Sequence, residues 1–277
     1  ATAIRLKQIA QERGADISVV VVEKGSEAGA HILSGAVVDP TGLDALLPGW
    51  SEESDAPLTT KVTDDHFYLL GPAGGVRLPN FAMPPLMNNH GNYIGSLGNL
   101  VRWLAQKAEA IGVEIYPGFA ADELLYDDKG AVRGIATGDM GVDKDGTPKG
   151  EFTRGMELRG RYTVFAEGAR GHLTKHLIAK FGLDAHSEPP KFGIGLKELW
   201  KVDPAKHRPG LVQHAFGWPL DPKTGGGAFL YHMEDHQVMV GFVLHLNYQN
   251  PYISPFEEFQ RFKSHPMFRD AFAGGKR

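Results

Sequence analysis

The most constraining feature of this sequence is a helical pattern followed directly by a run of β-branched residues that ends in an acid. Residues 3–13 place apolar and charged side chains at helical spacing, and Gly14 ends the pattern. Residues 16–23 read DISVVVVE, which predicts a buried parallel strand because the apolar run is nearly continuous. In a nucleotide-binding βαβ unit such an acid binds ribose hydroxyls, roughly 20 residues after a glycine-rich turn. Glu23 is therefore a candidate ligand, and a solvated strand end is the competing interpretation.

Composition excludes several classes of function. The 277 residues carry a net charge of −4, so nucleic acid is a poor partner for this chain. Cysteine is absent, which excludes disulfides and thiolate-bound zinc or iron–sulfur clusters within these residues. No run of 18 apolar residues predicts a membrane-spanning helix, and the first residues lack the layout of a signal peptide. Both ends read as cuts, so we expect an internal piece of a longer protein.

The middle of the chain reads as an α/β domain with a β insert. Residues 96–111 predict a helix with Ser96 as its N-cap and Gly112 after its end. Strands are expected at residues 113–116, 119–126, 131–137 and 157–165, with a polar, glycine-rich excursion over residues 138–155. The last strand runs into a small turn, Ala166-Glu167-Gly168, before a helix over residues 170–180. Such a turn lets backbone N–H groups approach a cofactor phosphate or adenosine, although a plain strand-to-helix turn has the same pattern.

After residue 189 the sequence changes to short apolar runs joined by connections rich in Pro and Gly, which predicts a second domain. Strands of an antiparallel sheet are expected at residues 192–199, 211–218, 227–233 and 237–246, followed by a helix over residues 255–263. We expect this sheet to cover the cofactor and to form a substrate pocket. The fold class is thus α/β with an α+β mix: a Rossmann-like domain with a β-meander insert, plus an antiparallel-sheet domain. The expected domains are residues 1–75 with 91–188, and residues 76–90 with 189–277.

Three shorter segments leave two interpretations open. The loop over residues 31–40 carries Ser34-Gly35, which could lie against a flat ring or form an ordinary turn. Residues 78–87, LPNFAMPPLM, are apolar, broken by proline and too short to span a bilayer, so they form either an interfacial loop or a buried one. His172 and His176 are one helical turn apart without an acidic partner, so a solvated helix face is expected rather than a metal site.

Several long strings carry a resemblance to a known family. They include GAHILSGAVVDP, NNHGNYIGSLGNLVRWLAQKAEAIGVEIYPGFAADELLY, GIATGDMGVDKDGTPK, FAEGARGHL, GIGLKELW, GWPLDPKTGGGAFLYH and LNYQNPYISPFEEFQRFKSHP. Over essentially all 277 residues the chain resembles the electron-transfer flavoprotein–ubiquinone oxidoreductase family. The strings are long and idiosyncratic, so neither chance nor a merely shared fold explains the likeness.

The resemblance implies a respiratory-chain flavoenzyme, an electron-transferring-flavoprotein dehydrogenase. It would take electrons from reduced electron-transfer flavoprotein and deliver them to ubiquinone, using FAD and a [4Fe–4S] cluster whose ligands are absent from this chain. It would dock on the inner membrane as a peripheral, monotopic protein, on the cytoplasmic face in a bacterium or the matrix face in a mitochondrion. No catalytic acid, base or nucleophile is expected, because the cofactor performs the redox chemistry. The chain alone is expected to be inactive and to bind FAD poorly.

The resemblance also assigns roles residue by residue. Cofactor-binding residues would be Glu23 at the ribose, the adjacent Lys24, His31, Ser34 and Gly35 by the flavin, and Ala166, Glu167 and Gly168 on the adenosine side. Gly226 and Gly227 would contact the quinone, because a ring can approach a backbone without Cβ atoms. The membrane contact would be made by Leu78, Phe81, Met83, Leu86 and Met87. Gly225 stands where the family usually has an aromatic residue, so the pocket differs there.

Two rival functions belong to other classes. A flavoprotein of the prenyl-reductase or hydroxylase type shares the FAD scaffold and would lack a cysteine-rich C-terminal segment. A non-enzymatic membrane-binding or assembly module would carry no flavin at all.

Overall fold

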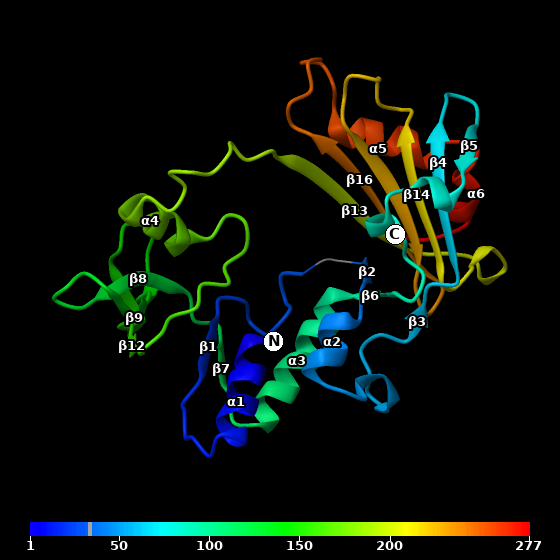
Figure 1. Cartoon of the computed structure of the whole chain (residues 1–277). Helices are drawn as coiled ribbons and strands as arrows, with labels where there is room; N and C mark the ends of the chain where they lie inside the picture. The colour runs from blue at the N-terminus through cyan, green and yellow to red at the C-terminus, as the bar shows by residue number, and fades with distance from the viewer. Residues whose placement is uncertain (33–34) are drawn as a thin grey trace. The chain divides into compact units, whose positions relative to one another are not determined.

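The computed structural model describes residues 1–32 and 35–277, and the chain divides into two compact units (Figure 1). Unit 1 comprises residues 31–106 and 190–277, with Ala1, and unit 2 comprises residues 2–30 and 107–189. Among the described residues, no helix is both long enough and apolar enough to cross a membrane.

Unit 1 is built on a six-stranded sheet with the order β13-β16-β15-β14-β4-β5. Its strands are β4 (Asp64–Leu70), β5 (Gly75–Leu78), β13 (Gly193–Lys201), β14 (Leu211–Gly217), β15 (Gly226–His232) and β16 (Gln237–His245). The four strands expected after residue 189 are confirmed, and they pair antiparallel among themselves. The sheet as a whole is mixed, because β14 pairs parallel with β4. β4 comes from far upstream in the chain, so the local sequence pattern does not encode this parallel pairing.

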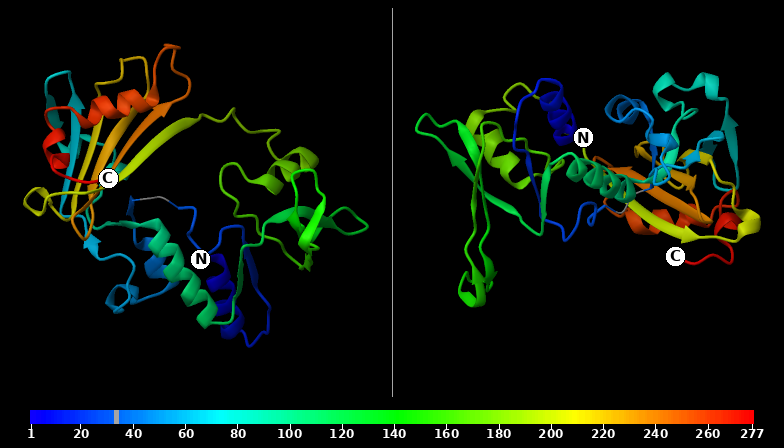
Figure 2. Two further views of the ribbon diagram at one scale, coloured as in Figure 1. Left: turned by 180° about the vertical axis from the view of Figure 1, so that it is seen from behind. Right: turned by 90° about the horizontal axis from the view of Figure 1, so that it is seen from below.

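One face of this sheet is covered by α5 (Pro255–Lys263), with α6 (Arg269–Phe272) beside it (Figures 1 and 2). The helix α5 spans the predicted residues because both ends are specified locally. Ser254 accepts the Glu257 N–H as an N-cap, proline occupies the first turn, and Arg261 and Lys263 lie in the last turn. Its buried Phe259 and Phe262 pack with sheet residues in the largest apolar cluster of unit 1.

The opposite face of the large sheet packs against a small one. This small sheet has the order β2-β6-β3, with β2 (Gly35–Val38), β3 (Thr60–Lys61) and β6 (Tyr93–Ser96). Ile94 and Met239 belong to the apolar cluster that joins the two sheets. A third cluster, which contains Trp50, Tyr93 and Trp103, holds α2 (Thr41–Leu46) and α3 (Leu97–Ala110) in place. The predicted helix over residues 96–111 is thus confirmed as α3.

Unit 2 contains two short helices and three small sheets. The helices are α1 (Thr2–Glu12) and α4 (His172–Phe181). β1 (Val20–Glu23) pairs parallel with β7 (Glu114–Pro117), and β8 (Ala121–Tyr126), β9 (Val132–Thr137) and β12 (Glu157–Arg159) form an antiparallel sheet of order β12-β9-β8. β10 (Met140–Val142) and β11 (Pro148–Thr153) form a hairpin that projects from this sheet, as the right-hand view of Figure 2 shows.

Two expectations about unit 2 were wrong in detail. The parallel pairing of β1 is confirmed, but the strand is half-exposed rather than buried, with Val20 41% exposed, because only β7 flanks it. The strand expected over residues 157–165 ends at Arg159. Beyond it no described strand offers hydrogen bonds, and Tyr162 and Val164 are exposed.

The two compact units do not follow the expected domain boundaries. Residues 31–75 and 91–106 group with residues 190–277, because the small sheet packs on the large one through buried apolar side chains. The expected boundaries describe which parts hold a cofactor or a quinone, and in that sense they stay a prediction.

Candidate functional site

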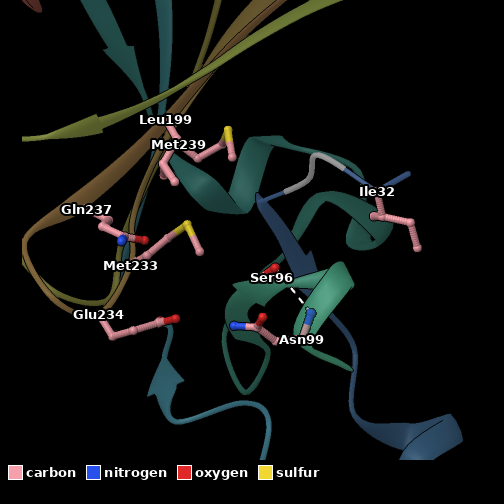
Figure 3. Close-up of a pocket in the computed structure, with 8 residues that line it drawn as sticks. All are labelled: Ile32, Ser96, Asn99, Leu199, Met233, Glu234, Gln237 and Met239. Carbon is pink, nitrogen blue, oxygen red and sulfur yellow. Dashed lines mark hydrogen bonds between the residues drawn. The ribbon is translucent and has the colours of Figure 1, made fainter. Parts of the chain in front are cut away.

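Unit 1 has a pocket of about 200 Å³ between the N-terminal turn of α3 and the turn that joins β15 to β16 (Figure 3). Methionine side chains from the large sheet lie on one side of it and polar side chains from the start of α3 on the other. The lining residues are Ile32, Ser96, Asn99, Leu199, Met233, Glu234, Gln237 and Met239.

Two local structures build the polar rim of this pocket. Ser96 Oγ accepts the Asn99 N–H at 3.3 Å, which confirms Ser96 as the N-cap of α3. Across the pocket, Asp235 and His236 have φ values of 54° and 58°, and the Gln237 N–H donates to the Glu234 carbonyl at 3.0 Å. Two left-handed residues make a tight hairpin turn that matches the twist of the strands. This turn presents Glu234 and Gln237 to the pocket.

The segment predicted to lie by the flavin borders the same pocket. Ile32 lines it, and His31 is exposed next to Ile32 in the sequence. Ser34 lies outside the described residues. Gly35 is buried at the start of β2, where an added Cβ would lie 2.7 Å from the Met239 side chain. Glycine is therefore required at position 35 for the chain to pack on the sheet.

Glu23 lies at the end of β1 in unit 2, where a nucleotide-binding unit places its ribose ligand. Its Oε1 accepts the Gly25 N–H at 2.6 Å, which fixes the carboxylate. Among the described residues, Oε2 has no hydrogen-bond partner, so it can accept a hydrogen bond from a hydroxyl group. Lys24 beside it is exposed.

The turn over residues 166–168 has a structural role that the sequence did not predict. Glu167 caps α4 from outside the helix, because its two carboxylate oxygens accept the N–H groups of Leu173 and Thr174 at 3.1 and 2.8 Å. Burial opposes ionisation of Glu167, but these hydrogen bonds outweigh it and lower its pKa. Ala166 and Gly168 are exposed, and Gly168 has a φ of 77°.

The predicted quinone-contacting glycines begin β15. Gly226 has a φ of 153°, and an added Cβ there would meet the Val243 carbonyl oxygen. At Gly227 a Cβ would lie 2.7 Å from the Ala215 carbonyl oxygen. Close approach of neighbouring strands thus already requires both glycines, whether or not a ring lies on them. At Gly225 an added Cβ would lie 2.5 Å from the His245 ring, so His245 fills the space of the missing side chain.

The segment predicted to touch the membrane follows β5 as two short turns, η2 (Asn80–Ala82) and η3 (Pro85–Met87). Phe81 is 91% exposed and Leu86 is 99% exposed, whereas Leu78, Met83 and Met87 are half-buried. The loop is not buried over the core at its apolar tips. Asp65 on β4 anchors it by accepting hydrogen bonds from Asn80 and Asn89.

The described residues contain no group of three or more side chains that could hold a metal ion. His172 and His176 are exposed on α4, and their rings stack with centroids 5.5 Å apart. The expected solvated helix face is confirmed.

Comparison with known proteins gives matches over the whole chain. Residues 192–277 match the family model described as ETF-QO, ubiquinone-binding. The chain is 58% identical over 277 residues to the electron transfer flavoprotein-ubiquinone oxidoreductase of Pseudomonas aeruginosa, covering 99% of this chain and 50% of the relative. It is 54% identical to the mitochondrial enzyme of Mus musculus, covering 99% of this chain and 45% of the relative. The chain thus spans about half the length of the curated relatives it matches.

Solved structures give the fold. A geranylgeranyl bacteriochlorophyll reductase-like protein from Thermoplasma acidophilum matches with a TM-score of 0.64 and 15% identity, covering 99% of this chain and 60% of that one. The myxobacterial chondrochloren halogenase, a FAD-dependent halogenase, matches with a TM-score of 0.64 and 15% identity over 99% of this chain and 58% of its own. At such identity the likeness is one of fold, and it confirms the predicted α/β fold class. By sequence, 99% of the chain is similar to electron transfer flavoprotein-ubiquinone oxidoreductases, at 58% identity to the bacterial relative and 54% to the mouse one.

Proposed function

We propose that this chain is the flavin- and quinone-facing part of an oxidoreductase that passes electrons from reduced electron-transfer flavoprotein to ubiquinone. The observation that carries the proposal is the match of residues 192–277 to a ubiquinone-binding family model. These residues supply four of the six strands of the large sheet, together with α5 and α6. The quinone ring would lie at Gly226 and Gly227, where backbone rather than side chain faces a ligand.

The chain's own residues fit the ribose end of FAD. The carboxylate of Glu23 is held by the Gly25 N–H, and among the described residues its second oxygen is free to accept a hydrogen bond from a ribose hydroxyl. The pocket beside Ile32 combines an apolar wall with the polar start of α3, which suits one edge of a flat heteroaromatic ring. Bound FAD would supply the capacity to take up and release electrons singly or in pairs. No cysteine is present, so this chain contributes no thiolate ligand to a [4Fe–4S] cluster.

A photoreactive azido-ubiquinone tests the quinone site directly. Illumination of the purified chain with the labelled probe should modify peptides from β14, β15 or β16. An excess of unlabelled short-tailed ubiquinone should remove the modification. Labelling that is spread over both units, or that ubiquinone does not compete, would contradict a quinone site on the large sheet.

Equilibrium dialysis with FAD tests the cofactor proposal. A chain extended to the length of its relatives should retain FAD, and Glu23→Ala should weaken its affinity about tenfold by removing one charge-assisted hydrogen bond. Glu151→Ala, at an exposed position of β11, is the matched control. Equal FAD affinity in both variants would remove Glu23 from the site.

The exposed tips of the loop after β5 support a second element of the proposal, peripheral docking on a membrane. Phe81 and Leu86 expose nearly their whole side chains, and Val76 on β5 is 65% exposed. In a flotation assay with phosphatidylethanolamine–phosphatidylglycerol vesicles, the chain should rise with the lipid. The double variant F81S/L86S should stay at the bottom, whereas Tyr162→Ser, which removes an equally exposed aromatic side chain from unit 2, should float. If both variants still float with the lipid, the membrane contact is not made by Phe81 and Leu86.

The two rival functions are less well supported. The prenyl-reductase type rests only on structures at 15% identity, which share the fold. The similarity to an oxidoreductase extends over 99% of the chain and so includes unit 2. A non-enzymatic membrane module would give no reason for that similarity.

A further inference from the structure

Three polar side chains lie in neighbouring strands on the face of the large sheet opposite α5. Asp65 of β4 and Tyr231 of β15 are both paired with Val212 of β14, so their side chains share this face. His214, two residues along β14, lies on the same face, and its Nε2 is 3.0 Å from Tyr231 Oη. Asp65 is only 2% exposed.

Two buried atoms of this group have no hydrogen-bond partner among the residues that the structure describes. Asp65 Oδ2 accepts both the N–H and the side-chain amide of Asn89, but Asp65 Oδ1 has no hydrogen bond. His214 Nδ1 is also buried and unpaired. Each such atom costs about 1–3 kcal/mol, and a buried acceptor near a ring nitrogen on the next strand is where a bound water would satisfy both.

We propose that Asp65, a bound water, His214 and Tyr231 form a buried proton relay that serves quinone reduction on this face of the sheet. The inference rests on the proposed function, because it needs the ring at Gly226 and Gly227. Gly227 and Tyr231 share a face of β15 and are four residues apart, about 13 Å at 3.3 Å per residue. The quinone ring and one or two waters span that length.

The step balances in atoms and electrons. A quinone that takes up two electrons and two protons becomes a quinol, with one new O–H bond on each carbonyl oxygen. The electrons come from reduced electron-transfer flavoprotein, the reductant of the proposed activity. For one of the protons, Tyr231 Oη–H releases its proton toward the ring while His214 Nε2–H gives its proton to Oη. His214 Nδ1 then takes a proton from the water, and a proton from solvent, guided by the Asp65 carboxylate, restores that water. Return of the imidazole to its Nε2–H tautomer resets the relay, and the second proton of the quinol comes from bulk water.

The surroundings of the relay are aromatic and buried, which favours the neutral forms of His214 and Tyr231. Phe67 stacks on His214 with ring centroids 5.1 Å apart, and Phe229 stacks on Tyr231 at 4.5 Å. Burial lowers the pKa of His214 and raises that of Tyr231, and Asp65 is the charged group that acts on both. Lys197 of β13 is a further charged group near this cluster, with its Nζ 5.7 Å from the centroid of the Phe229 ring. Asn80 and Asn89 of the covering loop are neutral.

Strand β4, which carries Asp65, also carries a histidine–tyrosine pair that serves as a matched control. His66 and Tyr68 of β4 alternate with Asp65 and Phe67, so they lie on the α5 face. His66 Nδ1 is 3.0 Å from Tyr68 Oη, and Tyr68 packs against Phe268 in the core. This pair has the same chemistry as His214 and Tyr231 but lies on the wrong face to reach the quinone.

The test uses the FAD-containing protein at the length of its relatives, with reduced electron-transfer flavoprotein and a short-tailed ubiquinone. Asp65→Asn and Tyr231→Phe keep shape and should lower kcat at least about tenfold, the lower range of proton-transfer effects, with KM changed less than twofold. The solvent deuterium effect on kcat should rise in both. Tyr68→Phe and His66→Gln should match the wild type, and the rate of flavin reduction by its donor should be unchanged in all four.

Each outcome decides a different point. Equal kcat values in the β4 control variants and in the relay variants would overturn the relay, as would a loss confined to KM. A wild-type protein that does not reduce ubiquinone would instead overturn the proposed function. A structure of the wild-type chain at high resolution supplies a second readout: water density between Asp65 Oδ1 and His214 Nδ1 supports the relay, and a dry gap contradicts it.

Discussion

The two units of this chain use their apolar residues in different ways. In unit 1, three clusters of buried side chains hold two sheets and the helices on them, and the four inner strands of the large sheet are paired on both edges. In unit 2 the buried residues are few and scattered, and β1 is flanked by β7 alone. Tyr162 is 92% exposed and Val164 is 65% exposed in a segment that reads as a strand. A strand-forming sequence therefore becomes a strand only where another strand accepts its hydrogen bonds.

The tryptophans make this comparison measurable. All four of them, Trp50, Trp103, Trp200 and Trp218, lie in unit 1. Tryptophan fluorescence in urea therefore reports the unfolding of unit 1, and amide hydrogen exchange of α4 reports unit 2.

The largest expected effect comes from emptying the main core. Phe242 is 1% exposed and stacks near Phe259 and Phe262, so Phe242→Ala should lower the free energy of unfolding of unit 1 by about 3–5 kcal/mol. Leu173→Ala, in α4, should cost about 2 kcal/mol, seen only in hydrogen exchange. If Leu173→Ala also shifted the fluorescence midpoint, the two units would unfold as one and the comparison would fail.

A buried ion network in unit 1 gives the second-largest expected difference in stability between the two units. Glu198 accepts hydrogen bonds from Lys263, from Trp200 at 2.8 Å and from Arg277 at 3.1 Å, and it is 8% exposed. Lys263→Met should cost about 3 kcal/mol, because it leaves a buried carboxylate with less compensation. Lys149→Met breaks the exposed pair with Asp143 in unit 2 and should cost less than about 1 kcal/mol. The loss is measured by fluorescence in urea for Lys263→Met and by hydrogen exchange for Lys149→Met. Equal losses would mean that the burial of Glu198 does not strengthen its ion pairs.

Acid should weaken unit 1 through a buried histidine. Burial, with the nearby His207 and Arg208, lowers the pKa of His232 to about 4 from an ordinary 6.5. The unfolded chain then binds the extra proton first, so stability is complete above pH 6.5 and falls by about 2 kcal/mol down to pH 5. His232→Asn retains an acceptor for the Arg208 N–H and should flatten the fluorescence-detected pH curve. His176→Asn, on the exposed face of α4, should leave the curve as it is.

The smallest effects concern helix caps. Ser254→Ala removes the local N-cap of α5, and Glu167→Ala removes the carboxylate that caps α4 from upstream. Each should cost about 1 kcal/mol, and hydrogen exchange should show the loss in the capped helix only. Faster exchange of the whole unit after Glu167→Ala would show that the turn over residues 166–168 holds more than one helix.

How much of the fold the sequence predicted depended on where its signals lie. α5 and α3 were predicted to within one residue, because Ser254 and Ser96 mark their starts in the local sequence. β4 was not predicted: it forms a local hairpin with β5, but its other neighbour, β14, comes from a distant part of the chain. β12 was predicted too long, because apolar alternation does not say whether a partner strand is present.

The candidate site divides in the same way. Glu23 could be placed at a strand end from its pattern alone, and the carboxylate lies there. Glu234 and Gln237 could not be placed at a pocket, because their tight turn uses Asp235 and His236 instead of the Asn-Gly or Asp-Gly pair that announces it. The family resemblance assigns Glu167 to the cofactor, and the structure shows that its carboxylate caps α4.

The parallel pairing of β4 with β14 has a consequence for the order in which the protein folds. The contact between Arg208 and Asp64 joins residues 144 positions apart. At a synthesis rate of about 5–20 residues per second, β4 and β5 wait roughly 7–30 seconds on the ribosome before their neighbour emerges. During that time the hairpin presents an unpaired edge and exposed Leu69 and Val76. We therefore expect the closing of this sheet to be a slow, aggregation-sensitive step of folding, with chaperones needed chiefly at the hairpin.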